Sequence, residues 1–195
     1  MTKQRKRISF GAEGMKIDLG GIAKGYTGQK LAELFQEYGV SSALVSLGGN
    51  IQAIGTKPDG SSWKVGIRDP KGGQQDYIGV LSVENQAVVT SGGYERYFEE
   101  DGETYIHIIN PRTGYPADGD LLSVTIVSKD GTLADGMSTA LYIMGYEKAC
   151  QFWRQHREEF NVILVTDDGK IHISENLKGN FQTEWELEMI ESGSE

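Results

Sequence analysis

The sequence predicts an α+β fold in which a largely antiparallel or mixed sheet is covered by helices. Two observations predict it. Short apolar runs are separated by turn signals that are close enough to join neighbouring strands as hairpins. Other stretches carry apolar residues at helical spacing. Strands that pair through hairpins, with helices laid over them, are typical of an α+β domain and not of alternating parallel units.

The first half of the chain is predicted to hold one helix and a series of strands. A short apolar segment over residues 17–22 ends in Gly20-Gly21 and leads into the helix, whose apolar residues and capping glycine are Leu31, Leu34, Phe35, Tyr38 and Gly39. Ser42–Leu47 is typical of a buried strand that Gly48-Gly49-Asn50 breaks. Strands are expected at 51–56, 62–69, 78–84 and 86–90, with turns at Pro58-Asp59-Gly60 and Lys71-Gly72-Gly73.

The second half is predicted to alternate hairpins with two helices. A hairpin around Asp101-Gly102 joins Arg96–Glu99 to Thr104–Ile109, and residues 121–128 form another strand. The first helix, from about Leu133 to Met144, buries apolar residues at helical spacing and stops at Gly145. The remaining elements are a helix over 146–158, a hairpin over 161–174 that turns at Asp167-Asp168-Gly169, and an acidic tail expected to fray over 185–195. Residues 1–195 are expected to form a single domain.

Composition excludes several classes of protein. A net charge of −9 argues against a nucleic-acid partner, and the single Cys150 excludes an intramolecular disulfide and a cysteine-based zinc site. No apolar run approaches the ~18 residues that a membrane span needs. Basic residues near Met1 have no apolar segment behind them, so no signal peptide is expected there. A chain this acidic would need a metal ion or backbone amides to bind phosphates.

A carboxylate and a hydroxyl lie one helical turn apart in the predicted helix that ends at Met144. Asp135 and Thr139 are four residues apart, so both side chains emerge from one helical face. Both are hard oxygen donors, which suit Mg²⁺ or Ca²⁺ and not zinc. Two such ligands fit Mg²⁺, which keeps waters and takes its other ligands from a phosphate. The alternative is that Asp135 caps its own helix and Thr139 bonds back to a carbonyl.

His107 is the strongest candidate for a general base. It alternates with Tyr105 and Ile109 on one face of the predicted strand, in an otherwise apolar run. Imidazole titrates near neutral pH and is the usual base for a hydroxyl proton, whereas the alternative is a purely structural strand histidine. His156 and His172 lie in polar contexts and are weaker candidates.

Three glycine-rich segments could present backbone amides to a phosphate, although glycine pairs at strand ends are also ordinary turns. They are Gly20-Gly21-Ile22-Ala23-Lys24-Gly25, Ser46-Leu47-Gly48-Gly49-Asn50 and Thr90-Ser91-Gly92-Gly93-Tyr94. Lys24, at the head of a helix, could add a positive charge. The first segment is not a Walker loop, because Tyr26 follows Gly25, and it lacks the dinucleotide-fold spacing.

These segments occur in a fixed order that raises their significance. Asp18–Gly25, Ser46–Asn50, Thr90–Tyr97, His107–Gly114 and Ala134–Thr139 together resemble the ApbE family of FAD:protein FMN transferases, formerly described as thiamine-biosynthesis lipoproteins. The resemblance covers about residues 8–180. It implies an ApbE-like, T-fold-related architecture and the transfer of FMN from FAD to a threonine or serine hydroxyl of a target flavoprotein, with release of AMP.

The resemblance also implies roles for individual residues. Asp135 and Thr139 would hold Mg²⁺ with the backbone carbonyl of Ala23, and the FAD diphosphate would complete the metal's shell. His107 would deprotonate the incoming hydroxyl. The residues expected to contact the cofactor are Lys24, Gly25, Gly48, Gly49, Asn50, Ser91, Gly92 and Thr113. The metal would screen the diphosphate and help AMP to leave, which explains how an acidic chain could bind an anionic cofactor.

The chain departs from the family pattern in two ways. The family usually has Asp where this chain has Asn110, which removes a charge near His107 and could alter its basicity or orientation. Family members also carry a long region before the first glycine motif, which helps to bind the adenosine and isoalloxazine parts of FAD. The chain therefore resembles the C-terminal catalytic portion, truncated at its N-terminus.

Two rival functions use the same fold. Hydrolysis of FAD to FMN and AMP needs the same metal, with water in place of the acceptor hydroxyl. A non-catalytic flavin-binding or scaffold fragment would keep the fold without the chemistry. The resemblance also implies an extracytoplasmic location, as a periplasmic or cell-surface lipoprotein, with a subunit of a membrane redox complex as the target flavoprotein.

Overall fold

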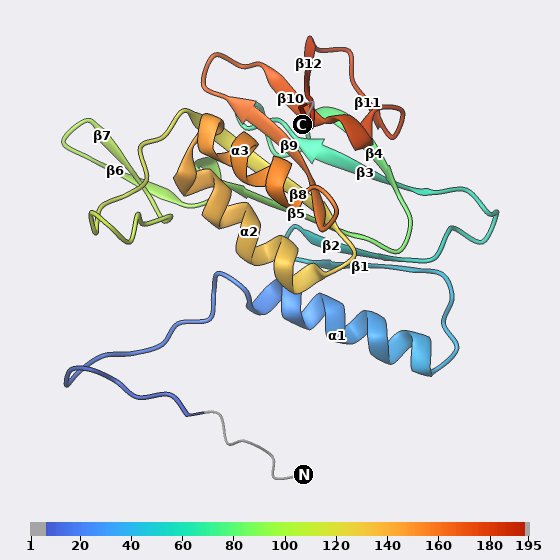
Figure 1. Cartoon of the computed structure of the whole chain (residues 1–195), viewed down its shortest axis with the longest axis horizontal. Helices are drawn as coiled ribbons and strands as arrows, with labels where there is room; N and C mark the ends of the chain where they lie inside the picture. The colour runs from blue at the N-terminus through green and yellow to red at the C-terminus, as the bar shows by residue number, and fades with distance from the viewer. Residues whose placement is uncertain (1–6, 194–195) are drawn as a thin grey trace.

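The computed structural model describes residues 7–193, which form three layers (Figure 1). The middle layer is a seven-stranded sheet with the spatial order β1 (Ala43–Leu47), β2 (Asn50–Ile54), β5 (Ala87–Gly92), β8 (Leu121–Ser128), β9 (Phe160–Thr166), β10 (Ile171–Ser174) and β12 (Leu187–Ile190). One face is covered by helices α1 (Ala23–Glu37), α2 (Gly131–Met144) and α3 (Tyr146–His156). The other face packs against a three-stranded sheet of β11 (Phe181–Gln182), β4 (Tyr77–Val83) and β3 (Trp63–Arg68).

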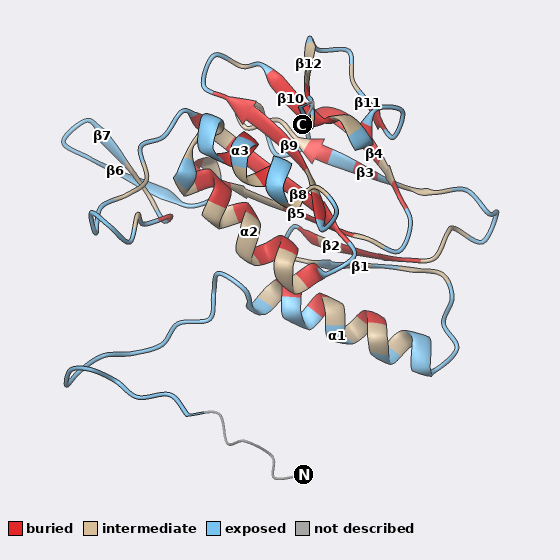
Figure 2. Ribbon diagram, in the orientation of Figure 1, coloured by how far each residue is buried: buried red, intermediate tan, exposed pale blue. Residues whose placement is uncertain are grey.

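The central strands are largely apolar, as expected where both faces of a sheet are buried, although β8 also buries Ser123 and Thr125. Neighbouring residues such as Ile126 and Val127 in β8 point to opposite faces. Ile126 joins the core beneath the helices, whereas Val127 joins the core between the two sheets. Figure 2 shows the buried residues gathered where the layers meet.

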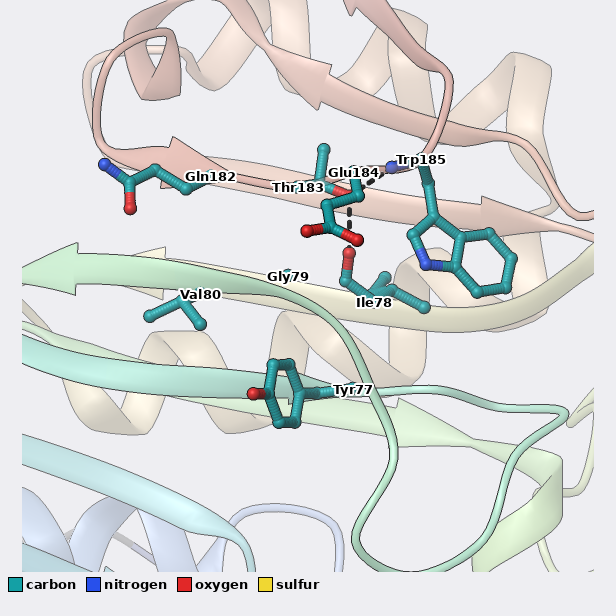
Figure 3. A pocket seen from close by; sticks show the side chains of 8 residues that line it. All are labelled: Tyr77, Ile78, Gly79, Val80, Gln182, Thr183, Glu184 and Trp185. Carbon is teal, nitrogen blue, oxygen red and sulfur yellow. Dashed lines mark hydrogen bonds between the residues drawn. The ribbon is translucent and has the colours of Figure 1, made fainter.

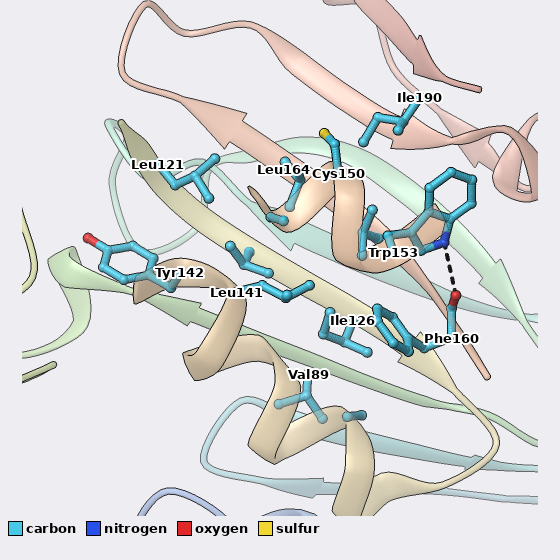
Figure 4. Close-up of a cluster of buried hydrophobic side chains, with 14 of the residues drawn as sticks. Val89, Leu121, Ile126, Leu141, Tyr142, Cys150, Trp153, Phe160, Leu164 and Ile190 are labelled. Carbon is cyan, nitrogen blue, oxygen red and sulfur yellow. Dashed lines mark hydrogen bonds between the residues drawn. The ribbon is translucent and has the colours of Figure 1, made fainter. Parts of the chain in front are cut away.

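The core beneath the helices anchors α2 and α3 to the sheet (Figure 4). Trp153 of α3 is fully buried, and its indole Nε1 donates a hydrogen bond of 3.0 Å to the carbonyl of Phe160. Leu141 of α2 is fully buried in the same cluster. The two helices are separated at Gly145, whose positive φ of 78° ends α2 in a conformation that glycine adopts without strain.

The start of α2 is fixed by a capping aspartate. Asp130 accepts hydrogen bonds from the amides of Thr132 and Leu133, at 2.8 and 3.0 Å. The helix therefore begins at Gly131, two residues before the predicted start. Asp135 therefore does not cap its own helix, and the alternative prediction that it does is wrong.

The predicted α+β class with a largely antiparallel, helix-covered sheet is confirmed. Every pairing of the seven-stranded sheet is antiparallel except that of β10 with β12 in the described chain. The strand at 121–128 has the predicted bounds. Gly39 follows α1 with a φ of 76°, as expected of a residue that terminates a helix. No helix among residues 7–193 has the length and apolar character that a membrane crossing requires.

The expectation of a frayed tail after residue 184 is wrong for residues 187–190. These residues form β12, which pairs in parallel with β10 and places Ile190, 2% exposed, in the core beneath the helices. The acidic composition of the tail concealed this strand, because Glu184, Glu186, Glu188 and Glu191 interrupt and flank its apolar residues. Residues 194–195 lie outside the described part of the chain.

A hairpin of β6 (Tyr97–Glu100) and β7 (Glu103–Ile106) protrudes from the body of the molecule in Figure 1. Its turn at Asp101-Gly102 is where the sequence placed it, with both residues at positive φ. The strand predicted over 104–109 is too long, because β7 ends at Ile106 and His107 lies in a bend beyond it.

Truncation of Ile190 tests whether β12 belongs to the core. Ile190→Ala is expected to lower the free energy of unfolding by about 2–5 kcal/mol, because it removes buried methyl groups and leaves a cavity. Glu191→Ala, one position further and exposed, should change it by less than about 0.5 kcal/mol. Urea denaturation of both variants measures the difference. Equal stability of the two variants would show that the strand is not docked.

Candidate functional site

The candidate site is built where the first turn of α1 meets α2. The backbone amide of Gly25, the third residue of α1, donates a hydrogen bond of 2.7 Å to Oδ2 of Asp135. The amides of a first helical turn have no partner within their own helix, and the helix dipole favours a negative charge there. Asp135 therefore caps α1 from the neighbouring helix.

This contact requires glycine at position 25. A Cβ on Gly25 would collide with the carbonyl oxygen of Gly131 and with Cβ of Asp135. Gly25 was predicted as a cofactor-binding residue, and the structure gives it a packing role that places Asp135.

Asp135 has the features of a cation ligand. Its side chain is buried, with the residue 5% exposed, and no lysine or arginine lies within ion-pair distance in the described chain. Oδ2 accepts from Gly25, whereas no described group donates to Oδ1. A buried carboxylate is stable only when it is paired, hydrogen-bonded or bound to a metal. No cluster of three or more carboxylate, histidine or cysteine side chains suited to a metal occurs within residues 7–193. A cation at Asp135 would thus take its other ligands from hydroxyls, backbone carbonyls or a bound phosphate.

A group of hydroxyls lies next to Asp135. Ser91 at the end of β5 has its Oγ 3.0 Å from Oγ1 of Thr139 and 2.8 Å from Oγ of Ser138. Ser138 is completely buried and also donates to the carbonyl of Asp135 at 2.9 Å. The structure thus brings Ser91, predicted to contact the cofactor, to Thr139, one of the paired predicted metal ligands. Ser138 was missed, and its only signal was its place between the two predicted metal ligands.

The third predicted metal ligand is already engaged. The carbonyl oxygen of Ala23 accepts a hydrogen bond of 2.8 Å from the hydroxyl of Thr27, one turn further along α1. As the first residue of α1, Ala23 also accepts the helical hydrogen bond four residues on, so a metal at Asp135 could use this carbonyl only by displacing a donor.

A second group of predicted residues surrounds the start of α1 on the side of the sheet. The β1–β2 connection is a two-residue turn in which Gly48 and Gly49 have φ of 55° and 93°, as a type I′ hairpin requires. Nζ of Lys24 donates to the carbonyl of Gly48 at 3.3 Å. The Nδ2 of Asn50 is buried and has no partner in the described chain. A buried amide donor without a partner is the feature here that fits a ligand oxygen.

His107 lies at the base of the β6–β7 hairpin, where it is exposed to solvent. Its Nδ1 lies 3.1 Å from the carbonyl oxygen of Arg96, and its backbone amide donates to the same oxygen at 3.0 Å. A carbonyl only accepts, so Nδ1 carries the proton and Nε2 of the neutral ring is free to accept one. No described hydrogen bond links His107 to Asp135 or Thr139.

The turn that follows His107 contains Asn110 and Thr113. Oδ1 of Asn110 accepts from the amide of Arg112 at 3.0 Å, and Oγ1 of Thr113 accepts from the amide of Tyr115 at 3.2 Å. An aspartate could make the Asn110 contact equally well. Asn110 therefore holds the turn, and no hydrogen bond joins it to His107 in the described chain. Thr113 is exposed, and its hydroxyl is used within this turn.

A cleft of about 480 Å³ lies between the turn that follows His107 and the part of α2 that carries Thr139. Thr139 and apolar residues of α2 form one wall, the turn at Asn110–Arg112 forms another, and Gly21 closes one side. Arg112 and Lys148 of α3 also line the cleft, and neither forms an ion pair in the described chain. Mostly apolar clefts with a few polar groups are typical of small-molecule sites. The cleft is the surface that joins the turn after His107 to the Asp135–Thr139 group.

Gly92 is not in this cleft. A Cβ at Gly92 would collide with the ring of Tyr94, so this glycine permits close packing at the end of β5.

Another hollow, of about 360 Å³, lies between β4 and residues 182–185, with Tyr77 and Trp185 at its sides (Figure 3). None of the predicted site residues lines it.

Solved structures resemble most of this chain. The ApbE protein of Thermotoga maritima matches with a TM-score of 0.78 and 38% identity, over 86% of this chain and 54% of that one. The flavin transferase ApbE of Vibrio cholerae matches with a TM-score of 0.72 and 32% identity, over 84% of this chain and 52% of that one. The fold is therefore that of the ApbE flavin transferases.

Sequence comparison gives the family itself. The model of the ApbE family matches residues 1–164, and the chain belongs to this family. A FAD:protein FMN transferase of Klebsiella pneumoniae is 43% identical over 83% of this chain and 49% of its own length. One of Treponema pallidum is 46% identical over 76% of this chain and 43% of its own length. The chain spans about half the length of the curated relatives that it matches.

A methyl group at position 25 tests the helix contact on which Asp135 depends. Gly25→Ala is expected to destabilise the fold by about 1–3 kcal/mol, because the methyl overlaps α2. Gly28→Ala is the matched control in the same helix, since its Cβ would meet its nearest neighbour at an ordinary 3.6 Å. Thermal melts of both variants compare them. A Gly25→Ala protein as stable as the control would contradict the close helix contact.

Proposed function

We propose that the chain carries out the Mg²⁺-dependent transfer of FMN from FAD to a threonine or serine hydroxyl of a target flavoprotein, with release of AMP. The observation that carries the proposal is Asp135, a buried carboxylate without a cationic partner in the described chain, next to the hydroxyl of Thr139 on the wall of a cleft. This donor set suits a hard cation whose remaining ligands come from a phosphate. The names of the relatives from Klebsiella and Treponema support flavin transfer.

The residues of the chain would bind and orient the dinucleotide. Asp135 and Thr139 would hold Mg²⁺ against the diphosphate, and the bound metal would stabilise the negative charge that develops on the leaving phosphate. Asn50, with its free Nδ2, and Lys24 at the start of α1 would donate to phosphate oxygens. The cleft beside Thr139 would receive one nucleoside end of FAD, with Arg112 and Lys148 at its edge.

His107 would act on the acceptor. Its Nδ1 proton is fixed by the Arg96 carbonyl, so Nε2 would take the proton from the acceptor hydroxyl. The hydroxyl oxygen would form a bond to the phosphorus of the FMN half, and the bond from that phosphorus to the oxygen of the AMP phosphate would break. The products are the flavinylated acceptor and AMP, with the proton left on His107. We also propose, from the family resemblance, that the acceptor is a subunit of a membrane redox complex met outside the cytoplasm.

Loss of the metal ligand should abolish metal-dependent FAD binding. Asp135→Asn keeps the size of the side chain but removes its charge, so FAD should bind equally with and without Mg²⁺. The wild-type chain should bind FAD more tightly when Mg²⁺ is added. Quenching of flavin fluorescence measures binding without any turnover. Glu147→Gln, a carboxylate on α3, is the control, and a Mg²⁺ effect that survives in Asp135→Asn would contradict the metal assignment.

Loss of the base should slow transfer without weakening FAD binding. His107→Ala is expected to reduce the rate by about 10²–10⁴-fold, because the acceptor hydroxyl loses its proton acceptor. Mass spectrometry of a threonine-containing acceptor measures the gain of one FMN. His156→Ala, which removes a surface histidine paired with Glu159, should transfer at the wild-type rate. Release of AMP without a mass gain on the acceptor would instead show hydrolysis. If the chain neither binds FAD nor turns it over, it is a non-catalytic scaffold.

A further inference from the structure

The hairpin of β6 and β7 is an unsupported element beside His107. All four residues of β6 are exposed, and the two strands form a sheet of their own that no third strand extends within residues 7–193. A two-stranded hairpin is marginally stable by itself in water. The protein therefore maintains a projecting arm whose outer surface contributes little to the core.

The two faces of this hairpin differ. Ile106 lies on the face turned to the body, because it packs against the core beneath the helices and would meet any Cβ at position 93. The opposite face carries Phe98 and Tyr105, paired across the strands and stacked with ring centroids 5.0 Å apart. Phe98 is 59% exposed. A stacked aromatic pair is thus presented to solvent and not to the core.

The same outer face is strongly acidic. Glu100 and Glu103 are directly opposite each other, next to the aromatic pair, and like charges in this position destabilise a hairpin. Residues 95–106 contain five carboxylates and a single cation, Arg96. None of Glu99, Glu100, Asp101 and Glu103 forms an ion pair in the described chain. The charge repulsion within the hairpin would be relieved by a cationic partner.

The hairpin is also connected to His107, the predicted base, through the chain and through hydrogen bonds. His107 follows β7 directly, and both its amide and its Nδ1 bond the carbonyl of Arg96, which precedes β6. A protein bound to the hairpin would therefore be held near His107. In the turn beyond His107, Ile109 is 48% exposed and Tyr115 is 72% exposed. Exposed apolar side chains therefore both precede and follow His107 along the chain.

We propose that the face of the hairpin formed by Phe98, Glu100, Glu103 and Tyr105 is the docking surface for the acceptor protein, and that the acceptor presents lysine or arginine beside the hydroxyl that receives FMN. Cations stack on exposed aromatic rings and pair with the two opposed carboxylates. The acidic hairpin steers such a partner toward the base. The proposal rests on the proposed function and adds the chemistry of the acceptor.

Two labelled peptides test the chemistry without FAD. One fluorescein-labelled peptide has lysine on both sides of a Leu-Thr pair, and the other has glutamate in the same positions. Fluorescence anisotropy should show binding of the lysine peptide to the 195-residue chain and at least about tenfold weaker binding of the glutamate peptide. Binding of the lysine peptide should weaken as salt is raised, because the charges involved are exposed.

Hairpin variants test the location. The E100K/E103K and Phe98→Ser proteins should bind the lysine peptide about tenfold more weakly, whereas Glu158→Lys, a charge change on a fully exposed surface glutamate, should not. FAD binding should be unchanged in all of them. In the transfer assay, the hairpin variants should raise KM for the lysine peptide and leave the release of AMP from FAD in the absence of peptide unchanged.

The outcomes separate this proposal from the proposed function. Equal binding of both peptides, no effect of the hairpin variants, or an equal effect of Glu158→Lys would overturn the docking surface. Weaker FAD binding in the hairpin variants would also overturn it, because the hairpin would then belong to the nucleotide site. If the peptide binds as expected and no FMN is transferred, the docking surface stands and the proposed transfer fails. Thermal melts identify any variant that does not fold.

Discussion

The hydrogen bond between the amide of Gly25 and the carboxylate of Asp135 is the contact on which the candidate site depends. It forms only because two glycines, Gly25 and Gly131, let α1 and α2 approach at backbone distance. The approach buries a carboxylate at the positive end of a helix and leaves one of its oxygens without a donor in the described chain. The same contact sets Lys24 over the β1–β2 turn. Two motifs far apart in the sequence become one site through it.

The three-layer arrangement makes this contact rigid. α2 packs on β5 and β8, and both faces of these two strands are buried in the core. Ser91 at the end of β5 then bonds Thr139 and Ser138 of α2, so the hydroxyl group is fixed between a helix and a strand that the core holds together. Sites on packed elements hold their geometry more closely than sites on loops. By contrast, His107 lies on a bend at the base of an exposed hairpin.

The sequence predicted the elements whose pattern is local. The strand at 121–128 and the helix ending at Met144 are continuous apolar or periodic runs, and turn glycines mark their ends. It did not predict β12, because an acidic composition hid three apolar residues whose burial depends on β10. It extended the strand to Ile109, because apolar alternation continues past the point where pairing stops. It placed Asp135 and Thr139 on one helix face, but the partner that Asp135 caps lies 110 residues away and carries no local signal.

The exposed position of His107 bears on the choice between transfer and hydrolysis. Its Nδ1 proton is committed to the Arg96 carbonyl, so Nε2 faces solvent whenever no acceptor is bound. As the proposed base, His107 in this state would activate water as readily as a hydroxyl, and nothing in its own hydrogen bonds discriminates between them. Discrimination must therefore come from whatever covers Nε2 and excludes water when FAD is present. The element placed to hold such a cover is the β6–β7 hairpin, which follows the Arg96 carbonyl that His107 contacts. Under the proposed function, the acceptor would complete the active site, and transfer would prevail over hydrolysis only while the acceptor is docked.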